Sequence, residues 1–362
     1  MNKPMLGSYK ESDCLFLMQE VQVEFETAEQ RESKVQSGIV HYSEKVGNEL
    51  PPTETYSSLF YEMMEKYKGR LATEVMSLAK KIVVNRSTYG TPDKPIVLLS
   101  LARAGTPIGV LLKRALDKLQ VSSVHYSISI IRDKGIDEAA LDYIVQNYED
   151  GAAVFIDGWT AKGVITKELH QAVEKYNASN GTSIPKELFV ISDIGGTADV
   201  TATYDDYTMP SALMNSTVSG LLSRSVLNDE ILATGGFHGC VVYRHLAEHD
   251  LSNWFIDEID KLMDVHSVCD DVVVSKEERQ LVTKKFMNTI MTEYSVSNIN
   301  RVKPGIAEAT RIMLRRTPDL LMVKDMQHVD TAHLVQIAIE KGIEIVVIED
   351  MPFGACSIIR DL

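Results

Sequence analysis

The sequence has no run of about 18 consecutive apolar residues, the length that a membrane-spanning helix needs. It also has few cysteines, and none of them form a Cys-x-x-Cys pair: Cys14, Cys240, Cys269 and Cys356. This spacing argues against a disulfide framework and against a thiolate zinc site. The first residues, MNKPMLGSYKESDC, lack the apolar core of a signal peptide. We therefore expect a cytoplasmic protein with reduced thiols.

Positive charge is scarce in most of the chain, whose 362 residues carry a formal net charge of −14. From Ser275 onward there are 12 basic and 12 acidic residues, so the part before it holds 25 basic against 39 acidic ones. An acidic surface repels a phosphate backbone, which makes this first part a poor candidate for nonspecific nucleic-acid binding. The shift in charge also predicts a domain boundary near residues 266–280.

Strand-like and helix-like segments alternate through the middle of the chain. Residues 58–85 carry apolar residues at helical spacing and predict one long or kinked helix. Apolar runs typical of strands, alternating with helical patterns, occupy 96–101, 122–131, 152–157 and 187–194. This alternation predicts an α/β fold with a mainly parallel sheet flanked by helices. Ligands bind such sheets beyond the carboxyl ends of the strands.

The segment DGWTAKG, residues 157–163, follows one of these strands. Asp157 can accept hydrogen bonds from vicinal ribose hydroxyls. Thr160, Ala161, Lys162 and Gly163 are expected at a helix start, where backbone N–H groups, a hydroxyl and a cation suit a monophosphate. Gly158 and Gly163 allow positive φ or close ligand approach. Trp159 either stacks on a base or ribose or packs over the loop. The segment matches neither a Walker A loop nor Gly-x-Gly-x-x-Gly.

Two further loops carry cations. In SLARAGTPIG, Arg103 is suited to grip a pyrophosphate, with Ala104, Gly105 and Thr106 closing around it. The alternative is that Arg103 caps a neighbouring helix. In IIRDKGID, Arg132 and Lys134 predict a mobile lid over anionic oxygens, or else a solvated turn.

Thiol and zinc chemistry are rival interpretations. Cys240 lies two residues after His238 and five before His245, so a Cys nucleophile with a His base is an alternative. The apolar sequence CVVY instead predicts a buried strand, where Cys is usually inert. His245 and His249 also match the His-x-x-Glu-His order of inverted zincins, a short pattern that arises by chance.

The three loops together resemble the type I phosphoribosyltransferases. That family has a pyrophosphate loop, a basic flexible loop and an acid-led phosphoribosyl diphosphate loop after successive strands. Its third loop usually carries two adjacent acids and then Thr-Gly, where this chain has Asp157-Gly158 and Lys162-Gly163. The resemblance implies Asp157, Arg103, Lys134 and Arg132 as catalytic residues, and Mg²⁺ bound together with phosphoribosyl diphosphate. It places an unknown acceptor against PSALMNSTVSG, with Asn215, Ser216 and Thr217.

A narrower resemblance covers residues 7–260. GSYKESDCLFL, QSGIVHYSE, SLARAGTPIG, DGWTAKG, PSALMNSTVSGLLSR and GGFHGCVVYRHL resemble the phosphoribosyltransferase-like proteins of tellurite-resistance and stress gene clusters, a family labelled cysteine protease StiP. It implies a phosphoribosyltransferase-like fold and a nucleoside-like product. The label keeps open a cysteine hydrolase using Cys240 with His238 or His245. A non-catalytic ribose-phosphate or RNA-binding protein is the third alternative.

The last part of the chain alternates strand and helix and predicts a small α/β/α sandwich. Basic residues gather at 301–316, where Pro304 and Gly305 suit a helix start. The arrangement resembles the Pelota-type, ribosomal-protein-like RNA-binding domain, which implies RNA contacts by Arg301, Lys303, Gly305 and Arg311; the alternative is a scaffold without RNA. We expect domains at 1–270 and 299–362 with a helical connector at 271–298. Expected partners are phosphoribosyl diphosphate, its acceptor and RNA, with no membrane and with a homo-oligomer left open.

Overall fold

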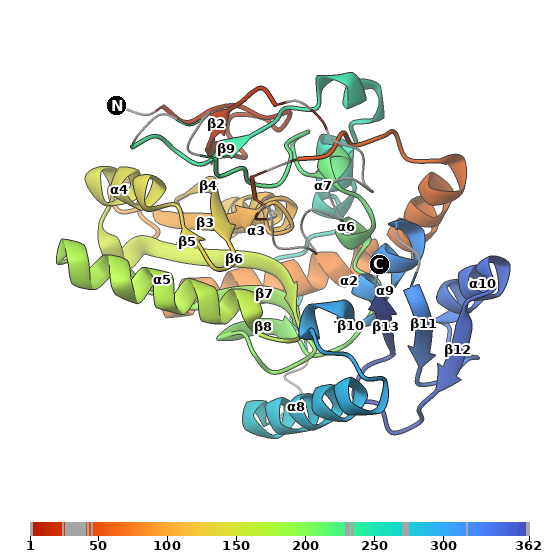
Figure 1. The fold of residues 1–362 in the computed structure, drawn as a ribbon. Coiled ribbons are helices and arrows are strands. Elements are labelled where there is room, and N and C mark those ends of the chain that lie inside the picture. Colours follow the sequence, from red (N-terminus) through yellow and green to blue (C-terminus); the bar gives the residue numbers. More distant parts are fainter. Residues whose placement is uncertain are drawn as a thin grey trace.

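A mainly parallel sheet lies at the centre of the first two thirds of the chain (Figure 1). The computed structural model describes residues 3–23, 25, 41, 43–44, 46–228, 232, 235–269, 275–315 and 318–359. The strands of this sheet, in spatial order, are β1 (Leu15–Leu17), β4 (Ser123–Ile131), β3 (Ile96–Ala102), β6 (Ala153–Thr160), β7 (Leu188–Asp193) and β8 (Val200–Thr203). Each neighbouring pair is parallel, and β5 (Gly135–Ile136) adds an antiparallel edge to β4.

Helices cover both faces of this sheet, as parallel sheets require. Alternate residues of β3 point to opposite faces: Leu98 packs in the core beneath α2 and α3, and Leu99 packs in the core beneath α4 and α5. The helices of this part are α2 (Glu54–Asn85), α3 (Thr106–Lys118), α4 (Glu138–Asn147), η1 (Asp150–Ala152) and α5 (Val164–Asn180). The predicted α/β class, with a parallel sheet flanked by helices, is confirmed.

Strand β6 is longer than the apolar run that predicts it. It continues through Trp159, opposite Ser192, and Thr160, opposite Asp193. Helix α5 begins only at Val164, after Gly163 in the left-handed region at φ 70°. Gly163 stands at the helix start, as expected, but the expected end of the strand at Asp157 is wrong. The reason is that β7 offers backbone partners beyond the apolar run, so pairing carries the polar residues into the sheet.

The chain after β8 folds back over the N-terminal segment. Strand β2 (Gln19–Glu20) pairs with β9 (Gly239–Cys240) at the top of Figure 1. The helical elements here are α6 (Pro210–Leu213), η2 (Ser216–Val218), η3 (Arg244–His249) and α7 (Ser252–Asp260). Of the segments that carry the family resemblance, QSGIVHYSE lies mostly outside the described residues.

Residues 275–359, called here the C-terminal unit, form a second sheet of order β10-β13-β11-β12. Its elements are α8 (Lys276–Glu293), η4 (Ile299–Arg301), β10 (Val302–Pro304), α9 (Ile306–Arg315), β11 (Pro318–Val323), α10 (Ala332–Lys341), β12 (Glu344–Val347) and β13 (Ala355–Ile359). One core joins α9 and α10 to the sheet, and another joins α8 through Met287 and Ile290. The helix expected as a connector thus packs in the core of this unit. None of the helices in the described ranges could cross a membrane.

Candidate functional site

Asp157 lies in β6, near the carboxyl edge of the central sheet. Its Oδ1 accepts a hydrogen bond from the backbone N–H of Gly158 at 2.8 Å. The pKa of Asp157 is raised to about 7: burial is the main cause and Glu308 of the C-terminal unit contributes, while the Gly158 amide and Arg311 oppose them. A carboxyl group that titrates near neutrality is suited to exchange its proton for a hydroxyl donor or a cation.

The loop after β3 runs directly against β6. A Cβ added to Gly158 would stand 3.4 Å from the carbonyl oxygen of Ala104, and one added to Gly105 would stand 2.5 Å from that of Ile156. A side chain at Gly105 would therefore displace backbone. Gly105 is needed for this close approach, which brings the loop SLARAGTPIG against the segment DGWTAKG.

Helix α5 starts just beyond the strand. Gly163 precedes it with φ 70°, and none of the described side chains caps this end, so the first-turn N–H groups remain available to an anion. Thr166, in that first turn, is buried with its hydroxyl unpartnered. Thr160 shares a hydrogen bond of 3.0 Å with Thr197. The end of β6 and the start of α5 thus present a hydroxyl pair and open amides.

Lys162 reaches from this loop to the C-terminal unit. Its Nζ donates to the carbonyl oxygens of Ile299 at 3.1 Å and Val302 at 3.0 Å. The pKa of Lys162 is lowered to about 8, mainly by burial and also by the like charges of Lys303 and Arg132, against the opposite effect of Glu308. Lys162, Arg132 and Lys303, from three separate segments of the chain, thus lie close enough to affect one another.

Helix α9 places a charged pair beside the same loop. Arg311 donates to Glu308 at 2.9 Å, and its guanidinium carbon lies 5.7 Å from the centre of the Trp159 ring. Burial raises the pKa of Glu308, but Arg311, Lys303 and Lys162 outweigh it, so the net shift is downward. The charged pair thus places the Arg311 guanidinium over the Trp159 ring.

Arg103 is bound by Glu49, an acid that no sequence pattern singles out. Its guanidinium donates to Glu49 at 2.8 Å and to the carbonyl oxygen of Leu222 at 3.1 Å. The other oxygen of Glu49 accepts from the backbone N–H of Ser216 at 2.9 Å and from its hydroxyl at 3.1 Å. One internal carboxylate thus binds residues that were predicted to contact pyrophosphate and acceptor.

The remaining predicted residues fall in different surroundings. Arg132 interacts with Lys162, as its effect on that pKa shows, whereas Lys134 lines a hollow of about 160 Å³ between α4 and α5. Thr106 is buried and shares a hydrogen bond of 2.8 Å with Ser127. Asn215 precedes η2, and Thr217 within it is buried, with its carbonyl oxygen accepting from Leu251.

Cys240 and His238 do not face each other. Cys240 is buried in the main core, where its Sγ contacts Met5 Sδ at 3.8 Å and burial raises the pKa of its thiol. His238 Nδ1 shares a hydrogen bond of 2.8 Å with Ser129. His245 Nε2 binds the carbonyl oxygen of Glu49 at 2.8 Å. Neither histidine serves Cys240 as a base in this conformation.

The zinc pattern has no geometric support. His245 and His249 lie on a 3-10 helix, where residues four apart do not share a face as they do on an α-helix. Across the described ranges, His, Cys, Asp and Glu form no group of three that could hold a metal ion.

The four residues predicted to contact RNA lie in different surroundings. Arg301 is bound within its own unit, to the Ile359 carbonyl oxygen at 2.9 Å and to Asp319 at 3.4 Å. Gly305, at φ 96°, packs against the first part of the chain. Lys303 and Arg311 interact with Lys162, Glu308 and Trp159, as described above.

Two family models match the chain. The model described as tellurite-like stress resistance cysteine protease StiP matches residues 7–260, and the PELOTA RNA binding domain matches residues 281–361. The protein named cysteine protease StiP from Acinetobacter baylyi (strain ATCC 33305 / BD413 / ADP1) is 38% identical over 370 residues, which covers 98% of this chain and 94% of that protein.

Similar solved structures include two purine phosphoribosyltransferases. The hypoxanthine phosphoribosyltransferase of Trypanosoma cruzi has 14% identity and a TM-score of 0.29, over 38% of this chain and 77% of that one. The HGPRT-ase of Leishmania tarentolae in complex with GMP has 15% identity and a TM-score of 0.29 over the same shares. Likeness at this level adds nothing to what the strand order itself shows.

Proposed function

This chain belongs to the family described as tellurite-like stress resistance cysteine protease StiP, and from its site we propose that it acts as a phosphoribosyltransferase-like enzyme. It would bind phosphoribosyl diphosphate at residues 157–163 and transfer ribose 5-phosphate to a base-like acceptor. The observation that carries this proposal is the placement of Asp157, Lys162 and the open start of α5 at one edge of a parallel sheet.

Each group has a role that its chemistry suits. The carboxylate of Asp157 would accept hydrogen bonds from the vicinal ribose hydroxyls. The first-turn amides of α5 and the hydroxyl of Thr166 would hold the 5′-phosphate, because a helix start favours negative charge. Lys162 adds a cation at the same end.

Transfer would break the bond between ribose C1 and the pyrophosphate oxygen, with the electron pair leaving on that oxygen. A lone pair of the acceptor forms the new bond to C1, and the acceptor then releases a proton. The transition state resembles an oxocarbenium ion, so orientation and charge stabilisation by the protein do most of the work. Glu49 and Leu222 both bind Nη1 of Arg103, so Arg103 would contact the leaving pyrophosphate through its other guanidinium N–H groups.

The residues fit magnesium only as an ion that the substrate brings. Asp157 is a suitable oxygen ligand, but the described residues hold no cluster of three metal-ligating side chains. Such an ion, bound by the diphosphate, would neutralise the charge of the leaving group. The chain's contribution is then the Asp157 carboxylate, together with the cations that surround the loop.

A cysteine hydrolase is the second candidate, because the family and the Acinetobacter relative both carry that name. The surroundings of Cys240 offer it little support. Burial raises the pKa of the thiol, and the nearby histidines bind other groups. A thiolate nucleophile needs the opposite: a lowered pKa and a neighbouring base.

Calorimetric titration with phosphoribosyl diphosphate and Mg²⁺ tests the proposal. Wild type and Cys240→Ala should bind, and Asp157→Asn should bind about tenfold more weakly or worse, since a carboxylate acceptor is worth more than an amide. Wild type that binds in neither the presence nor the absence of Mg²⁺ would refute the proposal. Peptide hydrolysis that disappears in Cys240→Ala would favour the second candidate.

A further inference from the structure

We propose that the C-terminal unit completes the sugar-phosphate site, with Lys303 and Arg311 contacting a small phosphorylated pentose together with Lys162. This inference rests on the proposed function and extends it. It assigns the basic residues of an RNA-binding-type domain to a small-molecule ligand held between the two parts of the chain.

The contact between the two parts is specific at the start of α9. Asp206, in the loop after β8, accepts from the backbone N–H groups of Ile306 and Gly354, each at 2.8 Å. Gly305 has φ 96°, and a Cβ there would stand 2.7 Å from Ile194 Cδ1. The negative side chain satisfies open amides at the positive end of the helix dipole, which fixes where α9 lies.

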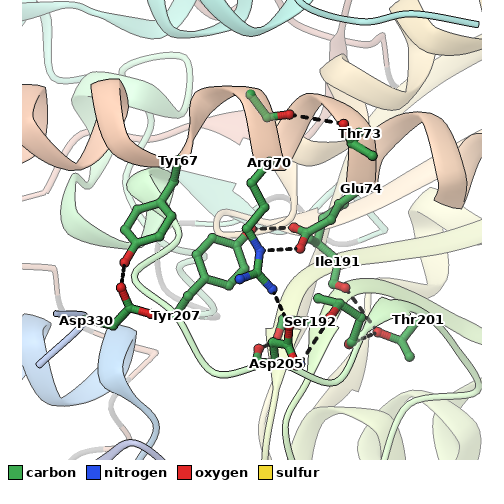
Figure 2. Close-up of polar contacts among 12 residues, drawn as sticks. Tyr67, Arg70, Thr73, Glu74, Ile191, Ser192, Thr201, Asp205, Tyr207 and Asp330 are labelled. Carbon is green, nitrogen blue, oxygen red and sulfur yellow. Dashed lines mark hydrogen bonds and ion pairs between the residues drawn. The ribbon is translucent and has the colours of Figure 1, made fainter. Parts of the chain in front are cut away.

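Two more contacts hold the C-terminal unit at other points. Figure 2 shows Tyr67 of α2 directed at Asp330, which also accepts from Lys66 at 2.7 Å. Arg279 of α8 donates to the carbonyl oxygen of Tyr204 at 3.2 Å, and Gln280 donates to that of Gly196 at 2.6 Å. Anchors on α2, on α8 and at α9 leave the unit little freedom to rotate.

This fixed position brings charges of one sign together. Lys162 bonds to the backbone on either side of β10's start, at Ile299 and Val302, and Lys303 follows directly in β10. Arg311 lies over Trp159, two residues from Asp157. Bringing cations together in partly dry surroundings is costly unless an anion joins them. Glu308 supplies negative charge here through its pair with Arg311, and a phosphate oxygen would add a further acceptor.

The same geometry makes a free RNA surface at these residues the weaker alternative. Arg311 lies over Trp159 of the first part, and Lys303 interacts electrostatically with Lys162. Arg301 is bound by Asp319 and Ile359 within its own unit. From Ser275 onward the chain has equal numbers of basic and acidic residues, so it lacks the excess charge that long-range attraction of RNA needs.

Titration of the full chain with ribose 5-phosphate, and separately with a labelled oligouridine, tests this inference. Lys303→Gln and Arg311→Gln should each weaken ribose 5-phosphate binding about tenfold or more, since each removes a charge-assisted contact. Lys324→Gln is the matched control, because Lys324 is an exposed lysine of the same unit and should bind as wild type does. Unchanged melting temperatures would show that the variants are folded.

The outcomes separate this inference from the proposed function. Wild type that binds no ribose 5-phosphate would overturn the inference, whereas the proposed function falls only if phosphoribosyl diphosphate also fails to bind. Wild type and both glutamine variants binding equally well would overturn only the inference. Oligouridine binding that depends on Lys303 and Arg311, while ribose 5-phosphate binding does not, would overturn it in favour of an RNA surface.

Discussion

The carboxylate of Glu49 lies 2.8 Å from the guanidinium of Arg103, on the loop that follows β3. Both side chains are more than four-fifths covered. The second carboxylate oxygen binds Ser216, so the acid joins the N-terminal segment to two loops at once. The Glu49 carboxylate thus binds the Arg103 guanidinium, the group predicted to contact pyrophosphate.

Replacing Glu49 by Gln should lower the free energy of unfolding by about 1–3 kcal/mol, because Arg103 would lose its charged partner in a largely buried position. Urea denaturation at neutral pH measures this. Glu20→Gln is the control: its pair with Arg244 is exposed, and its loss should cost about 1 kcal/mol or less. Equal effects of the two changes would contradict the structural weight given to Glu49.

The same pair predicts a pH dependence of stability. Burial raises the pKa of Glu49, but Arg103 and Ser216 outweigh it, so the folded pKa lies below the unfolded one. Its stabilisation is therefore complete above the unfolded pKa and is lost as pH falls through the folded value. The stability difference between wild type and Glu49→Gln should shrink below about pH 4. A difference that stays constant into that range would argue against an ionised pair.

Affinity for ribose 5-phosphate should be greatest between pH 7 and 8. Asp157, with a pKa raised to about 7, must lose its proton to accept from hydroxyls, so affinity rises through that pH. Lys162, with a pKa lowered to about 8, must keep its proton, so affinity falls above it. Calorimetry across pH measures both limbs.

The Asp157→Asn variant is the control for the lower limb. It should lose the change near pH 7 and keep only the one near pH 6 that comes from the phosphate itself. A lower limb that is identical in wild type and Asp157→Asn would show that Asp157 does not titrate on binding.

Of the four cysteines, Cys269 should be alkylated first. It is only half-buried, whereas Cys14, Cys240 and Cys356 are buried, and burial raises the pKa of each of these thiols. Iodoacetamide treatment of the native protein, followed by peptide mass spectrometry, should show Cys240 protected until the protein unfolds. Rapid labelling of Cys240 in the native protein would restore it as a candidate nucleophile.

Asp206→Ala should loosen the C-terminal unit. It removes the acceptor of two backbone amides, at a cost of about 1–3 kcal/mol, and hydrogen exchange should speed up at Ile306 and Gly354. Asp205→Ala is the matched control, since its exposed carboxylate pairs with Arg70 instead (Figure 2). Exchange that is unchanged at both amides would mean that Asp206 does not hold the unit in place.

Much of the fold follows from local pattern. The apolar runs at 96–101 and 122–131 match β3 and β4 closely, because a strand buried on both faces leaves a continuous hydrophobic signal. The end of β6 could not be predicted from the apolar pattern. Its last residues are polar or bulky, and their pairing with β7 determines where the strand stops. The alternative in which His238 serves Cys240 as a base is not met either, because His238 bonds to Ser129 and Cys240 lies in the main core.

The candidate site divides in the same way. That Asp157 and Lys162 lie at a ligand-binding edge follows from the rule for parallel sheets, which needs only the order of strands and helices. Their partners do not follow. Lys162 bonds to carbonyl groups more than a hundred residues away, and Glu49 reaches Arg103 from a segment without a clear pattern. Such contacts depend on how separate parts dock, which periodicity does not encode.

Lys162 is held by the main-chain carbonyl groups of Ile299 and Val302, so this interaction depends on the course of the backbone and not on the side chains there. Substitutions at those two positions can accumulate without moving the acceptors. An insertion or deletion between α8 and β10 would shift both. In the evolution of related chains, the length of this short connection should therefore be preserved more strictly than its residue identities.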